Sequence, residues 1–571
     1  MKKMMDETGK IANLNLVALA AAIALALAFA PALAATIVVP TSSNPDIQDG
    51  INAASSGDTV LLKAKCNSAI SAHCGFNGLY HQGVDIDKKL TLNCSGAILD
   101  ADVPLGKKGE TTDGGATTEF VGPIRLGGDG VDILSDGDGT TIVNCTIRNF
   151  KDNGIEVNDA DGVTIRRNTL INTDGDGGLD INSSDDYLVE RNTSIENKKA
   201  GFELDGDDGI IKNNIARGNE KVGFEVNGDR IEILHNRAFR NKDEGFKVTG
   251  DSVGSFTIIS NRAETNKKEG FKIKDADDST ISRNFARANE KPGFKIEGDG
   301  DDITIERNVS LFNQDDGFDI EGDGHIVNRN AAIGNGESGF KIKSFDTTIT
   351  RNRAFFNNKK AGFEIECKDG PPCGPITRNR SVGNVKAGFD LKKQSETTVS
   401  HNKAIENEED GFKIDDSNTT TFYHNLARDN GNSGFDIKDG DDNTFDRNKS
   451  IENDRDGFKI KDSESNTFIK NLAKKNSEDG FDLDDTDVDT VTMTGNRAIG
   501  NANTGIENDG GAFTTLEDNT MTGNGLDLAG KGDEDGDEAI TCPDSAGAAT
   551  DLGGNVFATG GFDFCTPGQT D

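Results

Sequence analysis

Tryptophan is absent from this sequence and tyrosine is rare. The chain has no Trp and three Tyr, although it has 31 Phe. Binding sites for neutral sugars usually offer exposed aromatic faces, most often from Trp and Tyr. If the protein binds carbohydrate, the composition therefore favours a charged glycan.

Long hydrophobic runs are also missing. The longest, from Leu16 to Ala30, has about 15 residues, fewer than the roughly 20 that cross a bilayer. It follows the basic pair Lys2-Lys3 and precedes small residues at 31–34, which is the order found in a secretory signal peptide. We therefore predict that residues 1–34 are a signal peptide, that no segment spans a membrane, and that the mature protein is secreted, periplasmic or on the cell surface.

Positive charge is scarce. The chain has 62 Lys and Arg against 99 Asp and Glu, a net charge of -37. Such a surface repels nucleic acid and anionic lipid, so we expect no nucleic-acid partner. Hydrophobic residues make up only 33%, yet their spacing is too regular for a disordered chain. A thin, elongated core reconciles these two observations, and the oligomeric state stays open.

The eight cysteines include no Cys-x2-Cys pair of the kind that binds zinc. In an exported chain this favours disulfides over a metal site. Proximity in the sequence suggests three pairs and leaves Cys94 and Cys145 unassigned. The pairs are Cys66 with Cys74, Cys367 with Cys373, and Cys542 with Cys565.

A Gly-Phe pair recurs about every 23 residues. Phe and the apolar residue two places later flank a polar residue, which predicts a short strand with one buried face. A second short strand follows in each unit, as at 303–308, and a third stretch ends the unit, as at 286–290 of the preceding unit. The phenylalanines are Phe202, Phe224, Phe246, Phe271, Phe294, Phe318, Phe340, Phe363, Phe389, Phe412, Phe435, Phe458 and Phe481, and Gly154-Ile155, Gly178-Leu179 and Gly505-Ile506 extend the series to sixteen units.

Two asparagines five residues apart mark almost every unit, as Asn192 and Asn197 do. Asparagine tolerates left-handed turns, and stacked Asn side chains can form a hydrogen-bonded ladder. Three short strands and three turns per 22 to 26 residues predict a coil of parallel strands with stacked phenylalanines at its centre. Leucine-rich and helical repeats need patterns that this sequence does not show.

The segment DIQDGINAASSGDTVLL (46–62) reads as a short amphipathic helix followed by a strand, and GLYHQGVDIDKKLTLNCSGAILDA (78–101) follows it. Both resemble the N-terminal cap and opening coils of right-handed parallel β-helix proteins, the pectate-lyase-like superfamily. The Asn-bearing repeats resemble the parallel β-helix repeat found there, and together the resemblance covers residues 46 to about 528. The resemblance implies an all-β, right-handed parallel β-helix (solenoid) with a short N-terminal helical cap. That superfamily contains lyases, hydrolases, epimerases, tailspikes and adhesins, so the fold does not define the activity.

These observations divide the chain into four parts. Residues 1–34 form the signal peptide, 35–130 the N-terminal cap and first coils, and 131–530 the repeats of the β-helix. Residues 531–571 form an acidic C-terminal segment in which we expect a disulfide.

The residue after each Phe is charged and points outward. From Lys295 onward, seven of the nine successive pairs in this column have opposite signs, as in a solvated face that stabilises itself. The first four members are all acidic. With the residues two places later, they bring eight oxygen-bearing side chains onto four consecutive coils: Glu156, Asn158, Asp180, Asn182, Glu203, Asp205, Glu225 and Asn227.

Hard cations such as Ca²⁺ prefer six to eight oxygen ligands, so we predict a Ca²⁺ site on this patch. The alternative is a merely acidic face whose repulsion is softened by salt screening or by basic neighbours. A basic group follows, predicted to bind an acidic polysaccharide: Lys247, Lys272, Lys274 and Lys295. Pectate lyases resemble this arrangement in using outward acids for calcium beside a basic residue, but their residue-level motif does not carry over.

Another basic column precedes the first Asn of each unit, as Arg307 does, and includes three of the six histidines. We interpret it as structural, paired with nearby acids, and its histidines as poor catalytic candidates. Three functions stay open. The first is a polysaccharide-associated binding or scaffold protein that could use Ca²⁺. The others are a lyase or epimerase of acidic glycans with a Lys or Arg base, and a purely structural rod or adhesin.

Overall fold

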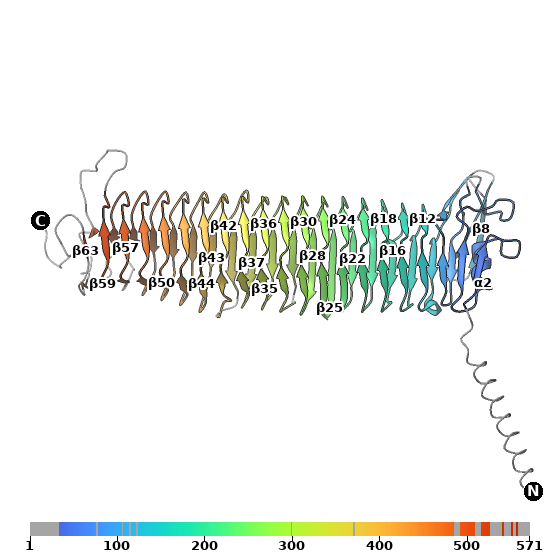
Figure 1. Ribbon diagram of the computed structural model, residues 1–571, viewed down its shortest axis with the longest axis horizontal. Coiled ribbons are helices and arrows are strands. Elements are labelled where there is room, and N and C mark those ends of the chain that lie inside the picture. The colour runs from blue at the N-terminus through green and yellow to red at the C-terminus, as the bar shows by residue number, and fades with distance from the viewer. Residues whose placement is uncertain are drawn as a thin grey trace, which may run out of the picture.

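A computed structural model shows the chain as a long straight rod whose strands run across its axis (Figure 1). It describes residues 34–75, 78–104, 107–113, 116–121, 124–298, 300–368, 372–484, 491–508, 515–525, 540–541, 550–551 and 556–557. The predicted signal peptide lies almost wholly outside these residues. So does most of the predicted C-terminal segment.

The rod is a coil of three parallel sheets, with 21, 19 and 19 strands in the described residues. One coil consists of β31 (Phe294–Glu297), β32 (Thr304–Glu306) and β33 (Val309–Leu311). Each strand pairs in parallel with its counterpart one repeat later, so that Thr304 lies beside Ile326 and Val309 beside Ala331. The predicted right-handed parallel β-helix is therefore confirmed.

The sheet that contains the Gly-Phe strands carries the candidate site. Its first strands are β3 (Val84–Ile86), β10 (Val131–Ile133), β13 (Ile155–Asn158), β16 (Gly177–Asn182), β19 (Ala200–Asp205), β22 (Phe224–Asn227), β25 (Phe246–Gly254) and β28 (Phe271–Ala276). After β31 it continues through β34 (Phe318–Glu321), β37 (Phe340–Ser344), β40 (Phe363–Cys367), β43 (Phe389–Lys392), β46 (Phe412–Asp415), β49 (Phe435–Lys438), β52 (Phe458–Lys461), β55 (Phe481–Asp484), β58 (Ile506–Asn508) and β61 (Ile540–Thr541).

The thirteen phenylalanines form one continuous stack inside the rod. All are fully buried, and neighbouring rings lie 4.7–4.9 Å apart with interplanar angles of 2–7°. Burying each ring contributes about 1.5–3 kcal/mol. The glycine before each Phe is required by packing, because a Cβ at Gly223 would lie 2.5 Å from the carbonyl oxygen of Gly245. The predicted core is confirmed.

The asparagine ladder is present, but its turn geometry differs from the prediction. The backbone N–H and side-chain amide of Asn308 both donate to Oδ1 of Asn330, at 2.9 and 3.1 Å. The left-handed conformation belongs to the residue before each Asn, with φ of 54° at Arg307 and 53° at His424. This residue turns the corner, while Asn points inward and is held in the ladder. Arg307 pairs with Glu306 at 2.6 Å, which supports the structural interpretation of the basic column.

Replacing one rung of this ladder is expected to destabilise the rod strongly. In Asn308→Ala, the two donors of Asn284 lose their acceptor and the carbonyl of Ile281 loses its donor. Because buried unsatisfied polar groups cost about 1–3 kcal/mol each, we expect a loss of about 3 kcal/mol in denaturant-induced unfolding. Arg307→Gly is the matched control; since glycine readily adopts a φ of 54°, its stability should stay within about 1 kcal/mol. Equal losses in both variants would contradict the ladder's role.

A short helix lies at the N-terminal end of the rod (Figure 1). Helix α2 (Ile47–Ala53) lies between β1 (Thr36–Val39) and β2 (Thr59–Leu62) and buries Ile47 and Ile51. An antiparallel hairpin, β7 (Lys108–Asp113) with β8 (Ala116–Val121), stands at the same end (Figure 1).

Three disulfides occur in the described residues. Cys66–Cys74 and Cys367–Cys373 confirm two predicted pairs, and the two unassigned cysteines, Cys94 and Cys145, bond to each other. The predicted pair of Cys542 and Cys565 lies outside the described residues. Disulfides fit an oxidising, extracytoplasmic compartment. Among the helices that the structure describes, none has the length and apolar character of a membrane span.

Candidate cation-binding face

The outward acids that the repeat pattern singles out are neighbours on four consecutive coils. The register pairs Glu156 with Asp180, Asp180 with Glu203, and Glu203 with Glu225. The second row pairs in the same way: Asn158 lies beside Asn182, and Asp205 beside Asn227. All eight predicted side chains therefore share one face, although their role in binding metal stays a prediction.

This row of acids extends further toward the N-terminus than the sequence analysis recognised. Asp132 of β10 pairs with Glu156, and Asp85 of β3 pairs with Asp132. The signal was available, because Gly83-Val84-Asp85-Ile86 and Gly130-Val131-Asp132-Ile133 repeat the unit with valine in the place of phenylalanine. The acidic face is defined from here on as the eight predicted residues together with Asp85 and Asp132.

Carboxylates in the centre of the acidic face are costly to ionise. Asp180 is 3% exposed, and its Oδ1 has no hydrogen-bond partner among the described residues. Burial, reinforced by the charge of Glu156, raises the pKa of Asp180 to about 6. Burial and the charges of Asp180 and Glu225 raise the pKa of Glu203 to about 7. Asp129, next to the face, has a raised pKa because it is buried against Glu156. These groups would gain from a bound cation.

The coil spacing suits a divalent cation held between two coils. Successive coils lie about 4.8 Å apart, which is twice a typical Ca²⁺–oxygen distance of about 2.4 Å. In the described part of the face, no three acidic side chains bring ligand atoms within 4.8 Å of one another. A cation would therefore take two carboxylates from neighbouring coils, with amide oxygens such as that of Asn182 beside them. Its other coordination positions would be free for water or an external ligand.

The four lysines that were predicted to bind substrate continue the same sheet, and each lies in an ion pair. Lys247 contacts Glu225 at 2.5 Å, and Lys274 contacts Asp275 at 2.9 Å. Lys272 and Lys295 share Glu297, at 3.0 and 2.6 Å. The lysines are therefore largely neutralised by carboxylates within the structure. Binding of a glycan there stays a prediction.

Farther along the rod the column alternates in charge, as predicted. Lys341 contacts Asp319 at 3.1 Å across one pair of coils, and Lys459 contacts Asp482 at 2.6 Å across another. The acidic face differs from this region in the charge of its column, which contains no basic residue before Lys247.

Two phenylalanines provide aromatic faces that the composition did not suggest. Phe312 and Phe356 are 57% and 59% exposed and lie at left-handed corners of the coil. Each ring lies over a glycine of the next coil, Gly334 and Gly383 respectively. The absence of tryptophan therefore does not leave the rod without exposed aromatic surfaces.

A family model described as "Right handed beta helix region" matches residues 117–238, 227–354, 316–453 and 376–521. These matches cover more than half of the chain, which therefore belongs to the right-handed β-helix family. No curated protein matches the sequence.

Several solved structures are similar in fold. A variant of the periplasmic alginate epimerase AlgG is 12% identical, with 73% of this chain and 83% of that chain covered and a TM-score of 0.26. The A-module of Azotobacter vinelandii mannuronan C-5 epimerase AlgE4 is 14% identical, with 82% and 91% covered and a TM-score of 0.21. Tailspike protein 3 of bacteriophage CBA120 is 10% identical, with 83% and 59% covered and a TM-score of 0.24. These values carry no argument about the activity of this chain.

Proposed function

We propose that the acidic face binds Ca²⁺ and, through it, an acidic polysaccharide, and that the protein is a binding or scaffold protein of the cell envelope or exterior. The observation that carries this proposal is a row of six carboxylates on six consecutive coils, from Asp85 to Glu225, on the side of the sheet that faces away from the core. Asp85, Asp132 and Asp180 in this row are buried by neighbouring groups. Like charges directly opposite each other on adjacent strands are unfavourable unless a cation lies between them.

The same geometry supports a bridging role for the cation. Ca²⁺ takes six to eight oxygen ligands, and two neighbouring coils supply only part of that number. Carboxylates of a uronate chain would complete the coordination. An acidic glycan would otherwise be repelled by a chain with a net charge of -37, so cation and glycan are expected to bind together.

The lysines favour binding over lyase chemistry. A lyase base must accept a proton, yet the hydrogen bond and charge of Glu297 raise the pKa of Lys295. Lys272 shares that carboxylate. Lysines that lie in ion pairs suit a static contact with an anionic chain better than proton abstraction.

Binding of the full-length protein to pectate and alginate, measured in Ca²⁺ and in EDTA, tests the proposal. We expect binding to at least one of these polymers in Ca²⁺, at least tenfold weaker binding in EDTA, and no absorbance from unsaturated uronate. Absence of binding in both buffers would contradict the proposal and favour a purely structural rod. Calcium-dependent appearance of unsaturated uronate would identify a lyase instead.

A further inference from the structure

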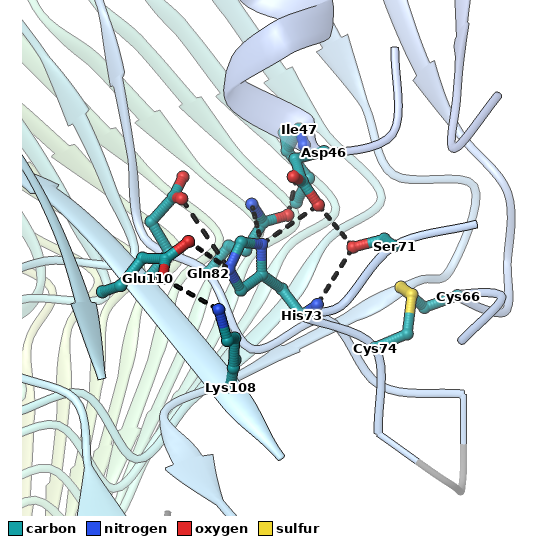
Figure 2. Close-up of polar contacts among 10 residues, drawn as sticks. Asp46, Ile47, Cys66, Ser71, His73, Cys74, Gln82, Lys108 and Glu110 are labelled. Carbon is teal, nitrogen blue, oxygen red and sulfur yellow. Dashed lines mark hydrogen bonds and ion pairs between the residues drawn. A yellow bond between two sulfur atoms is a disulfide. The ribbon is translucent and has the colours of Figure 1, made fainter. Parts of the chain in front are cut away.

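His73 lies buried at the N-terminal end of the rod, between one acid on one side and two on the other (Figure 2). Its side chain is 4% exposed, and its Nδ1 is 3.1 Å from Oδ1 of Asp46, the residue that precedes helix α2. Asp46 also accepts a hydrogen bond from the hydroxyl of Ser71. Oε1 of Gln82 accepts a hydrogen bond from the backbone N–H of Ile47 at 3.1 Å and so helps to fix the start of helix α2. The orientation of the imidazole is therefore determined from its Nδ1 side.

The other nitrogen of the ring faces two carboxylates without bonding to either. Nε2 of His73 is 3.8 Å from Oε2 of Glu110 and 3.9 Å from Oε1 of Glu119, too far for hydrogen bonds. It is buried and has no hydrogen-bond partner in the described part of the chain. The ligand atoms of a tetrahedral zinc site, with bonds of 2.0–2.2 Å, lie about 3.4 Å apart. Nε2 is thus within about 0.5 Å of this spacing from each carboxylate oxygen, and the three ligand atoms all lie within 4.8 Å of one another.

The hairpin places the two glutamates where a cation is needed. Glu110 of β7 and Glu119 of β8 lie directly opposite each other in the antiparallel register. Such like-charged pairs are destabilising. Lys108 contacts the other oxygen of Glu119, Oε2, at 3.1 Å, and leaves Oε1 facing His73. Among the described residues, this trio is the group of His, Cys, Asp and Glu whose ligand atoms all fall within 4.8 Å of one another.

We propose that His73, Glu110 and Glu119 bind one divalent transition-metal ion, for which Zn²⁺ is the best match. An imidazole nitrogen with two carboxylates suits zinc, whereas Ca²⁺ prefers oxygen ligands alone. Asp46 acts as the orienting carboxylate that accepts a hydrogen bond from the Nδ1–H of His73, as in many zinc sites. Glu119 is 55% exposed, so the ion can enter from solvent, and water completes the coordination. The metal would fasten the hairpin to the helical cap.

A protonated His73 is the competing explanation. Burial lowers the pKa of His73, but the hydrogen bond and charge of Asp46, with the charges of Glu110 and Glu119, raise it overall. A protonated ring would be expected to donate from Nε2 at about 2.8 Å, rather than to lie 3.8 Å from the nearer of the two oxygens.

Titration of the EDTA-treated full-length protein with Co²⁺ and then Zn²⁺, in excess Ca²⁺ to occupy the acidic face, tests this site. We expect one equivalent of Co²⁺ to give the visible absorption of a four-coordinate ion, and Zn²⁺ to displace it. Affinity for Zn²⁺ should fall at least 100-fold in His73→Gln and at least tenfold in Glu119→Gln. The control Asp180→Asn, Glu203→Gln should keep the affinity of the unmodified chain, because those residues lie outside the site.

Unchanged zinc affinity in Glu119→Gln would overturn the proposal, as would the absence of saturable Co²⁺ binding in the unmodified chain. Glu119 is mostly exposed, so this variant should fold even if the buried substitution at His73 does not. Asp46→Asn supplies a second measurement, because loss of the orienting carboxylate should weaken zinc binding about 10- to 100-fold.

Discussion

In EDTA, the double variant Asp180→Asn, Glu203→Gln should unfold at a higher temperature than the unmodified chain. At pH 8 both carboxylates are ionised in the fold, although their pKa values are raised to about 6 and about 7. Each raised pKa means that ionisation destabilises the folded state. Allowing for their mutual repulsion and for solvent screening around Glu203, we expect a gain on the order of 2 kcal/mol, measured by thermal unfolding.

The matched control lies in the same column of the same sheet. Asp319 and Asp482 contact Lys341 and Lys459, so Asp319→Asn, Asp482→Asn removes attraction rather than repulsion. We expect this control to be less stable than the unmodified chain by about 1 kcal/mol. If the acidic double variant is as stable as the unmodified chain, or less stable, the acidic face is not a site of uncompensated repulsion.

Stability in EDTA should also increase as the pH falls from 8.5 to 6.5. Burial raises the pKa of Asp316 and of Asp456 to about 7, as it does for Glu203. Because these values lie above those of the unfolded chain, the fold binds protons more tightly, and stability is lost as the pH rises through about 7. The three groups together should contribute on the order of 2 kcal/mol, measured by denaturant titration at constant ionic strength.

Three histidines oppose this trend, but only at the low end of the pH window. Burial lowers the pKa of His325, of His81 and, together with the charge of His424, of His401, so they cost stability as the unfolded chain takes up protons near and below its histidine pKa of about 6.5. The variant Asp316→Asn, Asp456→Asn should flatten the profile, because it removes two of the three titrating groups. Each Asn can still accept the hydrogen bond that its Asp accepts from a backbone N–H. A profile that rises with pH in the unmodified chain would contradict these assignments.

The fold was predictable because every coil repeats the same packing. Gly223 indicates a close approach of two backbones and Phe224 a buried ring, and the register places Phe224 beside Phe246. The left-handed corner was assigned to the wrong residue. Sequence periodicity marks both Arg307 and Asn308, but only the hydrogen bonds show that Asn is held in the ladder while Arg turns the chain.

The acidic face was predictable only in part. The first two coils carry valine before the acid, so a search based on Gly-Phe does not reach Asp85 and Asp132. Pairing of the lysines was also missed, because Glu297 lies two residues beyond Lys295 on the same outward face. The prediction followed the column of residues after each Phe, and Glu297 lies in the adjacent outward column.

The His73 cluster could not be predicted by such reasoning. Asp46, His73, Glu110 and Glu119 come from a helix terminus, a loop and a hairpin that follow no repeat. Their proximity depends on how the cap folds onto the first coils. No spacing in the sequence records it.

Calorimetric titration of Ca²⁺ into the full-length protein and into Asp180→Asn, Glu203→Gln tests the central claim most directly. The proposed function predicts saturable heat in the unmodified protein and at least tenfold weaker binding in the double variant. Equal and weak heats from both proteins would contradict it, and the row of acids would then be only the solvated side of the coil.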